Sequence, residues 1–189
     1  GVGPVQAPVD AWDLWGPTQE FPRLAHVLES VRDLLSPRTV LTILADYTLY
    51  ELPEDNATGH LIKLIPRDVQ FQAVELMAAR AHEGVKKRGL IYHTQGTGKT
   101  LAMVWAAGKM LNDPALQNPT VVLVADRIQL VRQAWDQFRT TGGQRLNVAA
   151  SNEDLRRRLA SHEMGGIDQR GLIFTTVHKF AGAPADMNL

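Results

Sequence analysis

The stretch with the clearest chemistry is a glycine-containing loop that ends in Gly98-Lys99-Thr100. Its two glycines, Gly96 and Gly98, allow the backbone to turn tightly, so that successive N–H groups can point at an anion. Lys99 is then placed to reach the β- and γ-phosphates of a nucleotide, and the Thr100 hydroxyl to ligate Mg²⁺. The pattern is that of a phosphate loop, although His93 stands where the first glycine is expected. We therefore predict a nucleotide site with Lys99 as catalytic residue, Thr100 as metal ligand and Mg²⁺ as a cofactor. The cofactor-binding residues predicted from the loop are Thr94, Gln95, Gly96, Thr97, Gly98, Lys99 and Thr100.

The elements on either side of the loop must position it. The apolar run 90–92 predicts a buried strand before the loop, and the helix formers of 101–111 predict a helix after it. A strand, a glycine loop and a helix in this order form the setting that a phosphate loop requires. A glycine-rich turn without a ligand is the alternative, and this setting makes it the weaker one.

Further strand and helix patterns follow the loop. The β-branched run 120–125 and the run 171–176 predict two more buried strands, and 127–140 predicts a helix between them. Repeated strand–helix units fold into a parallel sheet with helices on both faces, which predicts an α/β fold. Ligands of such sheets bind beyond the carboxyl ends of the strands.

The part before the loop predicts helices and a hairpin. Apolar residues of 20–35 recur at helical spacing and predict a first helix. Ser36 and Pro37 are residue types typical of an N-cap and of the first helical position. They predict the start of a second helix, which runs to about residue 46. Two strand patterns, 47–51 and 60–65, are separated by a polar turn segment and predict a hairpin.

A helix is predicted over 67–82, before the loop. The residues expected along one side of it are Val69, Ala73, Leu76, Met77 and Arg80. We predict three regions: a linker or a non-native end from cloning (1–18), a helical and hairpin lead-in (19–66), and an α/β domain that contains the phosphate loop (67–189).

The composition narrows the class of protein. The 189 residues contain 20 Lys and Arg against 20 Asp and Glu, so nucleic acid could be bound only by a local basic patch. No cysteine is present, which excludes disulfides, zinc thiolates and thiol catalysis. No apolar run approaches the roughly 20 residues of a membrane helix. We therefore expect a cytoplasmic protein that does not bind membranes.

Four blocks of the sequence together resemble a known family. They are 49–51, 66–74, the unusual lead-in Tyr92-His-Thr-Gln-Gly with its phosphate loop, and 173–180. This combination resembles the motor subunit of type I restriction enzymes, in helicase superfamily 2. The resemblance implies a three-layer RecA-like domain, here incomplete, that belongs to an ATP-dependent double-stranded DNA translocase of a restriction endonuclease. The partners that it implies are double-stranded DNA and the modification and specificity subunits.

The resemblance also assigns residues. The segment from Asp126 to Gln133 resembles motif Ia, and the segment from Thr175 to Phe180 resembles motif Ib. Gln70 is expected to read the adenine edge, because a side-chain amide both donates and accepts hydrogen bonds. The residues that this resemblance places on the DNA backbone are Arg127, Thr175, Thr176 and Lys179.

Two features of the family are not found in the 189 residues: its Asp-Glu-x-His box and its nuclease domain. We therefore expect a fragment that is inactive by itself. One alternative is another phosphate-loop NTPase or kinase in which Asp126, after the apolar run 121–125, is the Mg²⁺-associated acid. A second alternative is a non-catalytic nucleotide-binding module.

Overall fold

A computed structural model describes residues 15–16, 23–51, 62–85, 88–129, 131–132, 135–136, 146–148, 153–154 and 171–180. The chain divides into two compact units. The first comprises Gly1–Ala106 with Thr140–Gly142, and the second Ala107–Arg139 with Gly143–Leu189. The lead-in and the phosphate loop therefore share one unit, whereas the parallel strands belong to the other.

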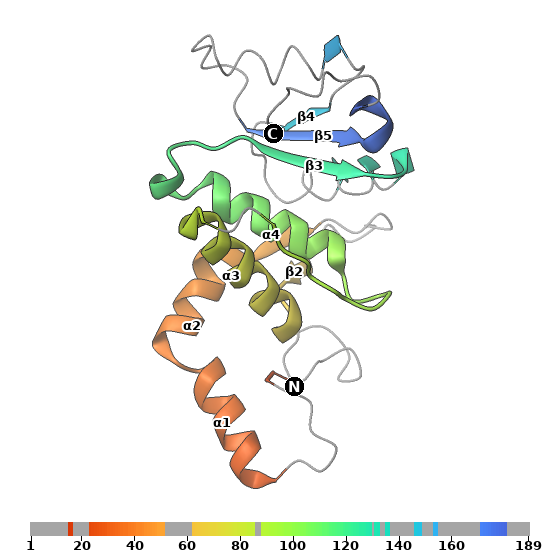
Figure 1. The fold of residues 1–189 in the computed structure, drawn as a ribbon. Helices are drawn as coiled ribbons and strands as arrows, with labels where there is room; N and C mark the ends of the chain where they lie inside the picture. The colour runs from red at the N-terminus through yellow and green to blue at the C-terminus, as the bar shows by residue number, and fades with distance from the viewer. Residues whose placement is uncertain are drawn as a thin grey trace. The chain divides into compact units, whose positions relative to one another are not determined.

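The lead-in begins with two short helices, coloured orange in Figure 1. Helix α1 spans Leu24–Leu34 and helix α2 spans Pro37–Thr42, followed by a π-helical turn over Ile43–Tyr47. The Ser36 hydroxyl accepts a hydrogen bond from the Thr39 N–H at 3.2 Å, which satisfies one of the free donors at the start of α2. Both predicted helices and the predicted cap are confirmed, with slightly shorter bounds.

The predicted hairpin is also present. Strands β1 (Leu49–Glu51) and β2 (Ile62–Leu64) pair antiparallel, with Leu49 opposite Leu64. The turn predicted over 52–59 lies outside the described residues.

Helix α3 (Asp68–Glu83) confirms the predicted helix and ends at Gly84, whose φ of 63° is the left-handed geometry of a C-cap. Of the residues expected along one side of this helix, Ala73 is buried, whereas Val69 and Leu76 are exposed. The polar residue Gln70 is buried instead, with its amide hydrogen-bonded to the Thr97 and Gly98 carbonyl oxygens. The buried residues of α3 are Asp68, Gln70, Ala73, Val74 and Ala78.

The strand predicted over 90–92, before the loop, is absent. Residues 88–94 form no strand, and Leu90 is 92% and Tyr92 83% exposed. A short apolar run becomes a strand only where neighbouring strands supply hydrogen-bond partners, and the sheets of the described residues include no strand there. Helix α4 (Lys99–Leu111) after the loop is present as predicted.

The second unit contains a parallel sheet in the order β3-β5-β4, whose strands lie side by side in Figure 1. They span Val121–Ala125 (β3), Leu146–Val148 (β4) and Leu172–Thr176 (β5). Central strand β5 is buried along its length, as predicted. Strand β3 was predicted to be buried on both faces, but it is only half-buried and Val124 is 50% exposed. Among the described residues, β3 pairs with β5 only and so lies at the edge of the described sheet.

Short helical turns complete this unit. One spans Pro114–Leu116 after α4, and another spans Val177–Phe180 after β5. The residues of 128–136 that the structure describes are helical, in agreement with the helix predicted after β3. None of the described helices is long and apolar enough to cross a membrane.

Candidate nucleotide site and nucleic-acid surface

The phosphate loop has the backbone geometry that its glycines allow. Gly96 and Gly98 have φ angles of 82° and 70°, in the left-handed region that is favourable only for residues without a Cβ. Lys99 then begins α4. The N–H groups of a helix's first turn lack partners within the helix, and they lie where the macrodipole is positive. This geometry is compatible with the anion site predicted at the start of α4.

The Lys99 side chain folds back over its own loop. Its Nζ donates to the carbonyl oxygens of His93 at 2.9 Å and Thr94 at 2.6 Å. The Thr97 hydroxyl donates to the same Thr94 carbonyl at 2.8 Å. The ammonium group is exposed and lies on the loop itself. A bound phosphate at this position would compete with two carbonyl oxygens for the Lys99 ammonium.

Gln70 lies against the loop although it is distant in sequence. It is 2% exposed, and its Nε2 donates to the carbonyl oxygens of Thr97 and Gly98, each at 3.0 Å. Its Oε1 accepts from the Arg67 N–H at 2.8 Å. The structure thus brings Gln70 together with the predicted loop residues. Its predicted role as an adenine reader stays a prediction, and in this arrangement both amide hydrogens are engaged by the loop.

Four aromatic side chains form a cluster that the sequence patterns did not reveal. The Tyr47 ring lies 5.0 Å from that of Phe71 and 6.0 Å from that of Trp105, measured between centroids. Trp15 packs on the other side of Phe71 at 5.3 Å. The Tyr47 hydroxyl donates to Glu75 Oε1 at 2.6 Å. This aromatic cluster joins the lead-in and α3 to α4, the helix that carries Lys99. The sequence shows that these aromatic residues are present, but no local pattern specifies which of them pack together.

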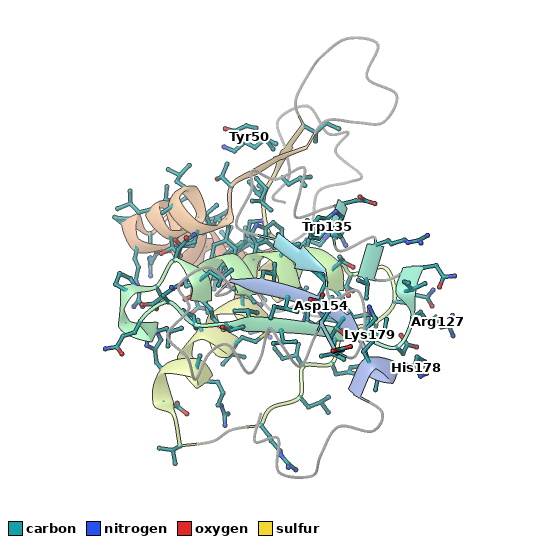
Figure 2. All side chains as sticks on the ribbon, turned by 90° about the horizontal axis from the view of Figure 1, so that it is seen from above. Tyr50, Arg127, Trp135, Asp154, His178 and Lys179 are labelled. Atoms are coloured by element: carbon teal, nitrogen blue, oxygen red, sulfur yellow. The ribbon has the colours of Figure 1, made fainter. Side chains whose placement is uncertain are left out.

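The predicted DNA-contacting cations lie at the ends of neighbouring parallel strands. In the register of β3 and β5, Ala125 is opposite Thr176, so Arg127 and Lys179 each follow the carboxyl end of a strand. Figure 2 shows Arg127, His178 and Lys179 at the same end of this strand pair. The Arg127 side chain is 76% exposed and its Nε lies 3.5 Å from Asp126 Oδ2, whereas Lys179 is half-buried.

The two threonines of the same prediction are placed differently. Thr175 is 0% and Thr176 8% exposed. The Thr175 hydroxyl is buried, and it has no hydrogen-bond partner in the part of the chain that the structure describes. Contact between these hydroxyls and a DNA backbone stays a prediction, and it requires the end of β5 to become accessible.

Comparison with known families identifies the chain. A model of the SWI2/SNF2 ATPase matches residues 69–188, which include the phosphate loop and all four residues predicted to contact DNA. The chain belongs to the SWI2/SNF2 ATPase family. This membership supports ATP use and disfavours the alternative of an unrelated phosphate-loop kinase or GTPase.

Relatives of this SWI2/SNF2 chain are restriction enzyme subunits. The type I restriction enzyme HindI endonuclease subunit of Haemophilus influenzae is 33% identical over 158 residues, which cover 78% of this chain and 14% of that subunit. The putative MjaVIIP endonuclease subunit of Methanocaldococcus jannaschii is 28% identical over 88% of this chain and 17% of its own length. The chain therefore spans about a sixth or less of these relatives. The predicted family resemblance is confirmed.

Proposed function

We propose that this chain carries the nucleotide-binding part of an ATP-dependent double-stranded DNA translocase that belongs to a type I restriction endonuclease. The observation that carries the proposal is the start of α4, where Gly98-Lys99-Thr100 follows two left-handed glycines. The SWI2/SNF2 match and the restriction-subunit relatives support it. A three-layer RecA-like arrangement and the division into a lead-in (19–66) and a motor part (67–189) belong to the same proposal.

The nucleotide fits the loop by its chemistry. The first-turn N–H groups of α4 would receive the phosphates, and nothing lies within 4 Å of the position that a Cβ on Gly96 would occupy. Lys99 would exchange its two carbonyl partners for phosphate oxygens, a stronger charge-assisted interaction. Among the described residues no three His, Asp or Glu side chains gather as a metal site. The phosphates and the Thr100 hydroxyl would therefore hold Mg²⁺, which supplies charge neutralisation when bound.

The DNA surface is proposed at the carboxyl ends of β3 and β5, where Arg127 and Lys179 lie. Cations that contact phosphates bind DNA without regard to sequence, as a translocating motor requires. The proposed partners are double-stranded DNA and the modification and specificity subunits of the restriction complex.

The central test replaces Lys99. In the full-length protein, Lys99→Ala should abolish DNA-stimulated ATP hydrolysis and translocation with any nucleotide. Lys109→Ala, in the last turn of the same helix, removes an equal charge away from the loop and should retain activity. Equal hydrolysis by the Lys99→Ala variant and the wild type would exclude this loop as the catalytic nucleotide site.

A further inference from the structure

Helix α1 carries an apolar face that the described part of the chain leaves exposed. The residues of this face recur at helical spacing along one side of the helix: Leu24, Val27, Leu28, Val31 and Leu35. Their exposed fractions are 74%, 49%, 55%, 45% and 65%, and no residue of α1 is buried. An amphipathic helix of a folded domain turns such a face towards other apolar side chains, whereas this one faces solvent.

Another side of α1 contacts the preceding residues. The Trp15 Nε1 donates to Asp33 Oδ2 at 2.9 Å, and Trp15 is 6% exposed. Gly16 passes so close to α1 that a Cβ on it would lie 2.7 Å from the Ser30 Oγ. At 3.6 residues per turn, Ser30 and Asp33 lie on the side of the helix away from Leu28. The helix is therefore held through polar side chains, and a rotation that turned its apolar face inward would break the bond between Trp15 and Asp33.

The relatives of the chain indicate where a covering surface can come from. The match to the putative MjaVIIP endonuclease subunit covers 88% of the 189 residues, and a continuous match of that length includes α1 wherever it begins. The SWI2/SNF2 model starts at residue 69, after α1. The helix thus belongs to the part that this chain shares with a restriction subunit and lies outside the matched ATPase. Only 17% of that subunit is covered by the match, so most of its polypeptide lies elsewhere.

The size of the face favours an occupant that is covalently attached. An α-helix of 11 residues is roughly 16 Å long, and five half-exposed aliphatic side chains offer on the order of 300 Å². A separate protein that binds stably buries about 800 Å² on each partner. A segment of the same polypeptide needs less area, because its effective concentration is high and docking costs it little translational entropy.

We propose that the apolar face of α1 is the docking site of a segment of the full-length polypeptide that lies outside residues 1–189. This segment presents apolar side chains to Leu28 and Val31, which lie near the middle of the face. The lead-in thereby joins the phosphate-loop unit to another part of the same restriction subunit. The docking does not depend on whether Lys99 binds a nucleotide.

Photocrosslinking in the full-length protein identifies the occupant. The photoreactive residue p-benzoylphenylalanine replaces Leu28 in one variant and, in the control, Glu29, which is exposed on another side of the same helix. After irradiation of the purified subunit, we expect position 28 to form an intramolecular crosslink to residues outside 1–189, located by mass spectrometry of its peptides. Position 29 should not form this crosslink. Val31 is a second crosslinking position, which keeps the test available if the first variant does not fold.

Hydrogen exchange provides a measurement without a bulky probe. Leu28→Gln and Glu29→Gln place the same side chain on two sides of α1, and leucine, glutamate and glutamine have similar helix propensities. In the full-length protein, exchange of residues 24–34 should be faster in Leu28→Gln than in the wild type and unchanged in Glu29→Gln, because only the first variant loses an apolar contact with the docked segment.

Other outcomes would contradict the docking of such a segment. A crosslink between two copies would make the face a homodimer contact, and a crosslink formed only with the modification or specificity subunit would make it a contact between subunits. A crosslink to residues within 1–189 would show that this chain covers the face itself. Absence of a crosslink, together with equal exchange in the two glutamine variants, would show that the face stays open to solvent.

Discussion

Replacement of Tyr47 by phenylalanine tests whether the lead-in is structurally part of the nucleotide-binding unit. Tyr47 is 0% exposed, lies between Phe71 and Trp105, and donates its hydroxyl to Glu75 at 2.6 Å. Phenylalanine retains the ring contacts and removes only this hydrogen bond. The variant therefore isolates the link between the end of the π-helical turn and α3.

The expected loss of stability depends on the charge and the burial of the acceptor, Glu75. A hydrogen bond to a charged group contributes about 1.5–3 kcal/mol to stability. Glu75 is half-buried, so water can replace part of the lost interaction, and we expect a loss of about 1–2 kcal/mol. For a chain of this size, 1 kcal/mol corresponds to about 2–4 °C in Tm. Tyr47→Phe should therefore lower the Tm by about 2–8 °C, measured by tryptophan fluorescence, which Trp15 and Trp105 report from within the cluster.

The same bond predicts a dependence on alkaline pH. Burial above all, then the hydrogen bond to Glu75 and the negative charges of Glu75 and Asp46, raise the pKa of Tyr47 far above its ordinary value. Above about pH 10 the unfolded chain loses the Tyr47 proton and the folded chain keeps it, so stability falls as pH rises. This group alone contributes a slope of about 1.4 kcal/mol per pH unit there, and the slope should be smaller by that amount in Tyr47→Phe.

Tyr92→Phe is the matched control, because Tyr92 is 83% exposed and its replacement should not change the Tm. If Tyr47→Phe behaves like this control, the Tyr47–Glu75 bond does not stabilise the unit. The lead-in would then be attached to α3 by its apolar contacts alone.

Two further predictions concern DNA and turnover. In the full-length protein, Arg127→Ala and Lys179→Ala should each lower the salt dependence of DNA binding by about one unit of logarithmic slope, similarly for all DNA sequences. His178→Ala is the control and should leave this slope unchanged. If the slopes of the Arg127 and Lys179 variants are also unchanged, these two residues do not contact DNA phosphates. The 189-residue chain by itself should release no phosphate from ATP, with or without DNA, because it contains no Asp-Glu-x-His sequence; DNA-stimulated release would make Asp126 the candidate acid.

Local features of this protein were predictable from its sequence. The hydroxyl of Ser36 and the ring of Pro37 mark the start of α2, and the left-handed glycines with Lys99 mark the start of α4. Each depends on residues a few positions apart, whose preferences are fixed by backbone sterics and by hydrogen bonds within one turn. The continuous apolar run of β5 was equally informative, because a strand with neighbours on both sides excludes polar residues over most of its length.

Tertiary structure decided which of these elements meet. Leu90 and Tyr92 have the residue types of a buried strand, yet both are exposed and neither belongs to a strand. Strand β3 carries the same apolar signal as β5, but its position at the edge leaves Val124 half exposed. The apolar pattern of a segment indicates which of its side chains can be buried. Whether they are buried depends on neighbouring elements from elsewhere in the chain, which the pattern does not specify.

The partner of Gln70 was the feature that the sequence could least determine. Its spacing from Arg67 predicts a helix start, and both the N-cap bond and the helix are local. Its bonds to Thr97 and Gly98 cross 27 and 28 positions of chain, and no periodicity encodes such a distance. They form because α3 is rotated so that a buried amide, which must find partners away from water, faces two loop carbonyls that also require donors.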